Sequence, residues 1–431
     1  MTETAGPVAD RQRAQCPMQH ASATHAPFAH EGMHAFFADI RPEVPIFHSP
    51  GIDYWVVTRR EDVRRILADS ERFSAEIATQ PICPWPQSVA AYLKSRNFTN
   101  EAVQVACDPP RHTRIRKIAA RFLNVRRFSF YEDALRDLVR GYLDRLEAER
   151  AAGRDEVDLV DAVFYEFPAQ AAFLLLGETD FDPRTIKKWG DLRLNMIWGR
   201  PTDAELAEAA ADLADFWDYA VALVKARMDA PKDDYPSFLL AARDGDDATL
   251  TINEINSLVF GILLAGHETT TNAAGNMFHA LLRHPDQWRK LLDDPALIPA
   301  AVEEGLRFAP SVVAWRRTAR EPVTVAGQDL PKGARLLLSI ASANRDEATF
   351  AQGEAFDVTR PNPRDHVAFG NGLHTCLGAP LARLELRILL EEMTARFPHM
   401  SLVPDQPMSW TPTLSFRGPQ ALRVRLGGAA A

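Results

Sequence analysis

The 431-residue chain is predicted to fold as one large, mainly α-helical domain with a minor β region. Apolar residues recur with the 3.6-residue period of an α-helix over 135–146, 160–176 and 204–228. No Gly/Ser-rich linker, charge block or internal repeat divides the middle of the chain. We expect residues 36–431 to form the domain, and residues 1–35, which are polar and rich in Ala, His and Pro, to be disordered.

The β elements are predicted near the N-terminus and in the last third of the chain. β-branched and aromatic residues over 54–58 predict a strand, which leads into a helix over 60–67. The Pro-rich stretch 74–108 is expected to be irregular. Short strands are predicted at 323–325 and 336–338, where turn residues separate brief apolar runs.

Composition excludes several classes of function. The net charge of −9 argues against a nucleic-acid-binding protein. The longest apolar run, 258–266, is far shorter than the roughly 20 residues that span a membrane, and the N-terminus carries no signal-peptide pattern. Cys16, Cys83, Cys107 and Cys376 form no C-x-x-C pair, which indicates a reducing compartment. We therefore expect a cytoplasmic protein with no membrane partner.

A capping box predicts the start of a long central helix. The Thr251 hydroxyl can accept from the amide of Glu254, while the Glu254 carboxylate reaches back. The helix is expected to run to His284, because Pro285 stops it. Thr269, in the middle, would then bond to the carbonyl of Ala265, which by itself indicates only a slightly bent core helix.

The sequence between Phe369 and Gly378 has the pattern F-G-x-G-x-H-x-C-x-G and precedes a helix predicted over 377–397. A lone cysteine is usually a small buried apolar residue. Here glycines flank Cys376 and permit close approach of a bulky group, and the helix N-terminus favours a thiolate. A thiolate held in this way can ligate haem iron.

This pattern resembles the haem-binding loop of the cytochrome P-450 family at every defining position, among them Phe369, Gly370, His374, Cys376 and Gly378. The resemblance implies the cytochrome P-450 fold, enclosing haem b (iron protoporphyrin IX) with Cys376 as the axial iron ligand. It also implies a monooxygenase that inserts one oxygen atom from O2 into its substrate. Electrons would come from NAD(P)H through a redox partner.

The middle of the central helix is similar to the acid–alcohol motif of the same family, A/G-G-x-D/E-T-T. The resemblance implies that Ala265 and Gly266 leave space for dioxygen beside the iron. Thr269 and Glu268 would then relay protons to bound oxygen. His267 occupies the variable position and is expected to be structural.

Three further motifs resemble the family's contacts to the haem carboxylates. His112 and Arg116 lie four residues apart on one helix face, Arg317 lies in a strand-like segment, and His374 lies two residues before Cys376. Any of these taken alone would be an ordinary surface charge.

Glu304 and Arg307 have the spacing of a surface ion pair worth a few tenths of a kcal/mol. The family carries such a pair as a structural element beneath the haem-binding loop. Arg360 or Asn362 is expected to complete the network.

Several segments resemble the haem domain of bacterial self-sufficient enzymes, in which a flavin and 2Fe–2S reductase follows the haem domain. These segments are 54–59, 198–201, 314–317, 342–347 and 415–419. Only 55 residues follow Cys376, and they contain no cluster motif, so FMN and 2Fe–2S are expected only in a fused or separate reductase. The chain is expected to be either a stand-alone relative or the haem domain of a longer parent.

The substrate pocket is expected to be lined by 74–107, the segment near Trp198, 263–265, 312–315 and 414–416. These residues are mostly apolar or aromatic, and no acid or base except Glu268 is available to fix a charged substrate. A small hydrophobic or aromatic substrate is expected, with O-dealkylation of aryl ethers among the reactions. Two alternatives remain, a peroxide-driven peroxygenase and a non-catalytic haem-based ligand binder; oxygen-dependent product formation separates them from a monooxygenase.

Overall fold

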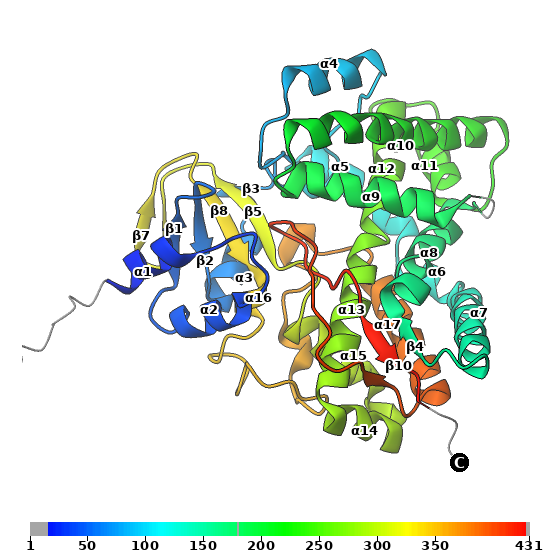
Figure 1. The fold of residues 1–431 in the computed structure, drawn as a ribbon. Coiled ribbons are helices and arrows are strands. Elements are labelled where there is room, and N and C mark those ends of the chain that lie inside the picture. Colours follow the sequence, from blue (N-terminus) through cyan, green and yellow to red (C-terminus); the bar gives the residue numbers. More distant parts are fainter. Residues whose placement is uncertain (1–15, 179–180, 428–431) are drawn as a thin grey trace, which may run out of the picture.

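The computed structural model describes residues 16–178 and 181–427 and places a sheet-containing region beside a larger helical one (Figure 1). The main sheet has five strands in the order β1 (Ile46–Ser49), β2 (Tyr54–Val57), β8 (Arg335–Ser339), β5 (Ala314–Ala319) and β3 (Phe73–Ser74). β2 and β8 pair in parallel and the other neighbours are antiparallel. The smaller sheets are a hairpin of β6 (Val323–Val325) with β7 (Gln328–Leu330), and β4 (Glu156–Asp158), β10 (Arg423–Arg425) and β9 (Ser401–Leu402).

Both faces of the main sheet are covered because its strands alternate buried apolar side chains. Val57 and Leu336 pack on one face with Val63 of α3 (Arg60–Ala68). Val56 and Leu337 pack on the other face with Phe37 of α2 (Met33–Ile40). α1 (Pro17–Thr24) and α16 (Ile340–Ala343) complete this region.

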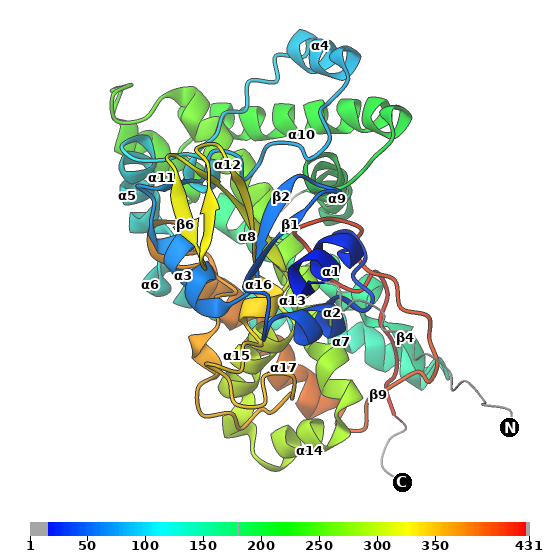
Figure 2. The same cartoon turned by 90° about the vertical axis from the view of Figure 1, so that its left-hand side faces the viewer.

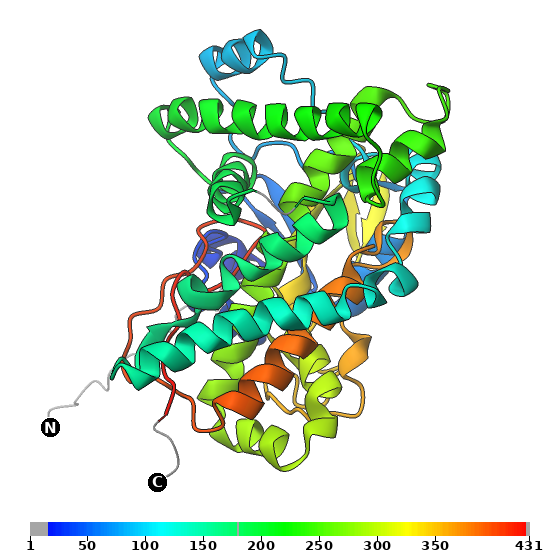
Figure 3. The same ribbon diagram turned by 90° about the vertical axis from the view of Figure 1, so that its right-hand side faces the viewer.

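The helical region contains the rest of the core. Its α-helices are α4 (Gln87–Ser95), α5 (Arg111–Phe122), α6 (Val125–Ser129), α7 (Glu132–Ala151), α8 (Phe167–Leu176), α9 (Pro183–Trp198), α10 (Asp203–Asp229), α11 (Tyr235–Arg243), α12 (Ile252–Ala265), α13 (Glu268–Arg283), α14 (Pro285–Asp293), α15 (Ile298–Phe308) and α17 (Ala379–Arg396). Short helical turns are η1 (Gln104–Ala106), the π-helical η2 (Val160–Phe164), η3 (Pro295–Leu297), η4 (Pro363–Asp365) and η5 (Gly372–His374). α4 lies over α10 at the top of the molecule (Figure 2), and α7 packs along α17 (Figure 3).

The predicted mainly helical fold, the strands near 54–58, 323–325 and 336–338, and the helix after Cys376 are confirmed. Four local expectations differ from the structure. α1 and α2 begin within 1–35, where disorder was expected, while residues 1–15 lie outside the described residues. α4 interrupts the stretch expected to be irregular. The segment 160–176 is divided at 165–166 into η2 and α8, and Pro168, which cannot donate a helical hydrogen bond, lies in the first turn of α8.

The fourth difference concerns the central helix, which is broken into α12 and α13 at Gly266–His267. The capping box at its start is confirmed: the Thr251 hydroxyl accepts from the Glu254 amide at 3.0 Å, and the Glu254 carboxylate accepts from the Thr251 amide at 3.1 Å. Glycine is a poor helix former, and this position is where the helix opens.

Glu254 also ties α12 to α5. Its buried carboxylate accepts from Arg114 at 2.6 Å and from Arg111 at 3.1 Å. Burial acts to raise the pKa of Glu254, but hydrogen bonds from Arg114, the Thr251 amide and Arg111 outweigh it and hold the pKa at about 2. The two helices are thereby joined through one ionised group.

Glu254→Gln is expected to lower the free energy of unfolding by about 2 kcal/mol at pH 7, because glutamine keeps the cap but loses the charge. A pKa that is depressed on folding stabilises the protein above the ordinary glutamate value of 4.5, and this contribution is lost as pH falls toward about 2. Urea unfolding at several pH values should therefore show a flatter acid limb for the variant. Equal slopes for variant and parent would contradict this account.

Candidate active site

One cavity brings together residues from four distant parts of the chain. It has a volume of about 310 Å³ and an apolar wall. It is bounded by the junction of α12 and α13, by β5, by the loop before α17 and by η1. Of the residues singled out in the sequence, it is lined by Arg116, Ala265, Gly266, Thr269, Arg317, Phe369, Gly370, His374, Cys376 and Gly378.

The loop that carries Cys376 is held by its backbone. Gly370 and Gly372 both have φ of +75°, a conformation that other residues rarely adopt. A side chain at Gly372 would also come within 2.7 Å of the Ala68 Cα atom. The Cys376 amide donates to the Phe369 carbonyl at 2.9 Å, so the cysteine is fixed with its sulfur in the cavity wall.

The surroundings of the Cys376 sulfur have two opposite effects on the pKa of its thiol. Burial raises the pKa of the thiol, while the backbone N–H groups of Gly378 and Ala379 act to lower it. The two amides at the start of α17 act in the direction predicted from the sequence, and Cys376 is exposed toward the cavity. A positive partner in the cavity would add to their effect.

The break between α12 and α13 opens the helix toward the cavity. Ala265, Gly266 and Thr269 all lie in the cavity wall. The Thr269 hydroxyl donates to the Ala265 carbonyl at 2.9 Å, as the sequence predicted for a bent core helix. The hydroxyl thus satisfies a carbonyl at the break and also faces the cavity.

Glu268 lies behind this wall rather than in it. Its buried carboxylate accepts from Lys187 of α9 at 2.5 Å and lies 3.0 Å from the Nδ1 atom of His267. Burial acts to raise the pKa of Glu268, but the Lys187 ammonium holds it below its ordinary value. Burial and the nearby Glu268 carboxylate raise the pKa of Asp191, also on α9, to about 7.

Sequence reasoning missed Lys187, because 81 residues separate it from Glu268. A lysine in an amphipathic helix gives no sign that its ammonium group is buried.

Four basic residues lie together at one edge of the cavity: Arg116, Arg317 and His374 in its wall, and His112 against His374. None of the four has a carboxylate partner within the described residues. The rings of His112 and His374 lie 4.2 Å apart, and neither ring nitrogen of either residue has a hydrogen-bond partner in the described part of the chain. Arg317 is buried and donates to the Arg316 carbonyl at 2.8 Å, while Arg116 donates to the Thr375 carbonyl at 2.5 Å. Burial lowers the pKa of Arg317 to about 10, so the guanidinium stays charged.

Glu304 and Arg307 form a buried pair beneath this region, not the surface pair that their spacing alone indicates. Arg307 donates to both Glu304 oxygens, at 2.6 and 2.7 Å, and Arg360 lies 3.2 Å from Glu304. Of the two residues expected to complete the network, Arg360 does so. Asn362 instead donates to the Thr349 carbonyl and to Asp365.

The expected pocket lining is met in part. Val312 and Trp315 line the cavity together with Gln104 and Val105 from the stretch 74–107, and of 263–265 only Ala265 does so. Leu263 is fully buried in the core instead. Trp198 and Phe416 form an apolar cluster with Trp315, with ring centres of Trp198 and Phe416 4.9 Å apart.

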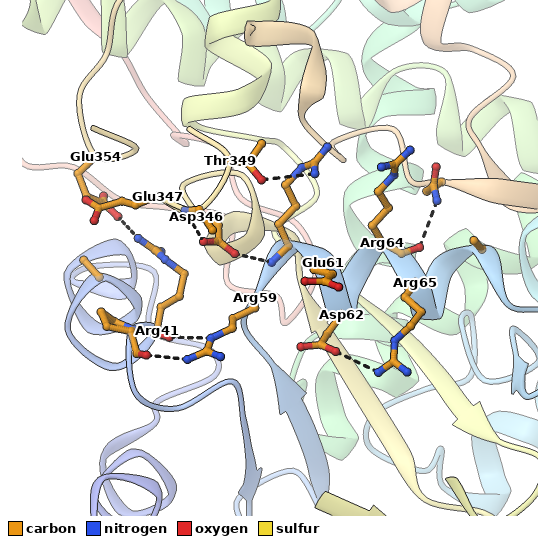
Figure 4. A pocket seen from close by; sticks show the side chains of 16 residues that line it. Arg41, Arg59, Glu61, Asp62, Arg64, Arg65, Asp346, Glu347, Thr349 and Glu354 are labelled. Carbon is orange, nitrogen blue, oxygen red and sulfur yellow. Dashed lines mark hydrogen bonds and ion pairs between the residues drawn. The ribbon is translucent and has the colours of Figure 1, made fainter. Parts of the chain in front are cut away.

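A larger hollow of about 950 Å³ beside α3 has a different character (Figure 4). Its charged side chains largely pair with one another: Arg41 with Glu354 at 3.0 Å and Arg65 with Asp62 at 3.0 Å. The Arg60 amide donates to Asp346 at 2.8 Å. The smaller cavity, with its apolar wall, is therefore the candidate active site.

Comparisons with known proteins agree on one family. The family model described as cytochrome P-450 matches residues 53–416. Cytochrome P-450 107B1 of Saccharopolyspora erythraea is 34% identical over 384 residues, which cover 88% of this chain and 90% of that protein. Cytochrome P-450 monooxygenase PikC of Streptomyces venezuelae is 33% identical over 394 residues, 90% of each chain.

Solved structures give the same result. Cytochrome P-450 CREJ has a TM-score of 0.89 at 36% identity, covering 93% of this chain and 99% of that one. An intact type IV self-sufficient cytochrome P-450 monooxygenase also has a TM-score of 0.89 at 36% identity, covering 95% of this chain but 54% of that one. The chain belongs to the cytochrome P-450 family and is a haem-thiolate monooxygenase. The predicted likeness to the haem domains of self-sufficient enzymes is confirmed. Within the described ranges, no helix has the length and apolar character needed to cross a bilayer.

Proposed function

We propose that this monooxygenase oxidises a small hydrophobic or aromatic substrate, with O-dealkylation of aryl ethers among its reactions. The observation that carries the proposal is a single apolar cavity whose wall contains both Cys376 and the opened helix at Ala265, Gly266 and Thr269. Haem b, the cofactor of the family, would activate O2 with electrons from NAD(P)H. Electrons would arrive through a redox partner, either a separate protein or a fused reductase that carries FMN and a 2Fe–2S cluster.

The residues of the cavity fit a haem. Its two carboxylates need cations or hydrogen-bond donors, and His112, Arg116, Arg317 and His374 offer these groups without a carboxylate partner of their own in the described chain. Cys376 would supply the sulfur ligand, with Phe369, Gly370 and Gly378 beside it.

Thr269 and Glu268 would move protons into the cavity. The Thr269 hydroxyl is already at the wall, whereas Glu268 must first exchange its contact with Lys187. Proton transfer from Glu268 therefore depends on a movement of α9 or of the Lys187 side chain. Asp191, whose pKa is raised to about 7, lies near Glu268 and can exchange protons at neutral pH.

The lining of the cavity favours hydrophobic substrates. Haem would occupy the part of the cavity beside Cys376, and Trp315 and Val312 provide apolar contacts for the substrate. Cytochrome P-450 CREJ, whose structure is similar, is described in complex with (4-ethylphenyl) dihydrogen phosphate, a small aryl compound. One relative is described as a 6-deoxyerythronolide B hydroxylase, but the apolar and aromatic lining here supports the aryl class.

The absorption spectrum of the reduced protein under carbon monoxide tests the proposal first. We expect the long-wavelength Soret band that gives the family its name. Titration with aryl methyl ethers should then convert ferric iron to high spin, and NAD(P)H, O2 and a reductase should yield the phenol. A parent protein that shows the band but binds and oxidises no aryl ether would contradict the substrate class.

Thr269→Ala is expected to lower product formed per NAD(P)H by on the order of tenfold and to release hydrogen peroxide instead. The reason is that alanine removes the hydroxyl at the helix break while leaving the cavity wall apolar. Coupling is measured as the ratio of product to NAD(P)H consumed.

Thr270→Ala is the matched control, because this neighbouring threonine is also in the cavity wall but does not bond to the Ala265 carbonyl. Thr269→Ser should keep most of the coupling. If Thr269→Ala and Thr270→Ala have the same coupling as the parent, Thr269 only satisfies the carbonyl at the break.

A further inference from the structure

Arg193 on α9 is a buried cation without an anion. Its side chain is 8% exposed, and within residues 16–178 and 181–427 it makes neither a hydrogen bond nor an ion pair. Its guanidinium group lies over the ring of Phe260, 4.1 Å from the ring centre. Burial alone lowers its pKa to about 9, so it remains charged at neutral pH. A buried charge normally has a partner, because its desolvation is otherwise uncompensated.

The ring of Phe260 compensates only part of this cost. Phe260 packs edge-on against Phe216 and Trp217, with ring centres 4.8 and 5.4 Å away, so the guanidinium sits in an aromatic cluster. Aromatic faces attract a cation but accept no N–H hydrogen bond of ordinary strength. The five donors of the guanidinium therefore remain available for a group that accepts hydrogen bonds.

Arg193 is next in sequence to an apolar cluster that borders the active-site cavity. Leu194, the following residue, forms one apolar cluster with Trp198 and Leu264 and with the cavity residues Val312 and Trp315. On α12, Phe260 precedes Leu264 by one turn. Beside it, a side chain added at Gly261 would meet no atom within 4 Å. Arg193 is thus not part of the cavity wall itself but lies behind the apolar residues that border it, on the side of α12 that carries Phe260.

We infer that Arg193 binds an anionic group, a carboxylate or a phosphate, at the end of the substrate remote from the oxidised carbon. This inference rests on the proposed function and narrows its substrate class to aromatic acids. Phe260 and Ala265 are five residues apart on α12, about 7.5 Å along the helix axis and about 140° around it. A substrate with its acid group at Arg193 and its reacting substituent at the helix break would therefore pass along the side of α12 that carries Gly261, where a side chain would meet no atom within 4 Å.

The sequence alone predicts the opposite, because it indicates no base available to fix a charged substrate in the segments expected to line the pocket. Arg193 lies in an amphipathic segment that also contains exposed Lys188, and only the fold distinguishes the buried cation from the exposed one.

The test compares acids with their uncharged amides in the purified holoenzyme. The probes are 4-methoxybenzoate, 4-methoxycinnamate and the corresponding amides, and dissociation constants are measured from the Soret shift and by calorimetry. The parent should bind each acid at least about tenfold more tightly than its amide. Arg193→Met should remove this preference by weakening only the acids, and Arg193→Lys should keep most of it.

Lys188→Met is the matched control, because it removes one positive charge from the same helix at the surface, where Lys188 pairs with Asp212. It should bind every probe as the parent does. In turnover, Arg193→Met should raise KM for the acids and leave kcat nearly unchanged, as expected for a positioning residue.

The inference is overturned if amides bind the parent as tightly as acids, or if Arg193→Met weakens acids and amides equally. The first comparison needs no variant, so it decides even if Arg193→Met fails to fold. A failure of the proposed function would give another result. Acids would then bind in an Arg193-dependent way, yet neither acids nor amides would be oxidised.

Discussion

Replacing Cys376 with alanine is expected to abolish the long-wavelength Soret band of the reduced, carbon-monoxide-bound protein and all O2-dependent turnover. Cys376 is the cysteine in the cavity wall, and its position is fixed by the hydrogen bond to Phe369 and by two glycines with positive φ. Alanine leaves this backbone unchanged and removes only the sulfur. The measurement is the carbon monoxide difference spectrum together with the haem content of the purified protein.

Cys107→Ala is the matched control. Cys107 lies near α5 and, unlike Cys376, is buried and outside the cavity wall; burial raises the pKa of its thiol to about 11. This variant should retain the band of the parent.

His374 is the alternative candidate for the iron ligand, and the experiment must exclude it. Its ring nitrogens have no partner in the described chain, and it lies in the same cavity wall. If Cys376→Ala keeps the spectrum of the parent while His374→Phe loses it, the assignment of Cys376 as ligand is wrong. If both variants lose haem but only Cys376→Ala loses the band in the residual holoprotein, His374 holds the cofactor without ligating iron.

The parts of this site that are local in sequence could be predicted. The loop around Cys376, the capping box at Thr251 and the strand at Tyr54 each depend on residues a few positions apart, and all three are present. The bond from Thr269 to the Ala265 carbonyl belongs to the same group. The break at Gly266–His267 was missed because a single glycine costs a helix only about 1 kcal/mol, which neighbouring contacts can outweigh in either direction.

The parts that depend on distant contacts could not be predicted. Lys187 and Glu268 are 81 residues apart, and Glu254 and Arg114 are 140 apart, so no periodicity joins them. Burial also changes what an ion pair of given spacing contributes to stability. Glu304–Arg307 and Asp62–Arg65 have the same spacing, yet the first pair is fully buried and the second is partly exposed. From charge and spacing alone, both pairs would be expected to make the same small contribution to the free energy of unfolding.

Arg307→Met is therefore expected to cost about 3–5 kcal/mol of unfolding free energy, enough to prevent accumulation of folded holoenzyme at 37 °C. The substitution leaves the Glu304 carboxylate buried beside Arg360 alone and removes three further hydrogen bonds. Arg307 donates these to the carbonyls of Asn344, Gly353 and Ala355. Urea unfolding at 15–25 °C measures the change.

The matched control is Arg65→Met, which breaks the Asp62–Arg65 pair of the same spacing at the surface of α3. An exposed pair is worth about 0–1 kcal/mol, so this variant should unfold close to the parent. Removing both buried charges in Glu304→Leu with Arg307→Met should restore part of the stability lost in Arg307→Met, because no unpaired carboxylate remains. Similar unfolding midpoints for Arg307→Met and Arg65→Met would show that the buried pair does not hold the segment 344–360 against α15.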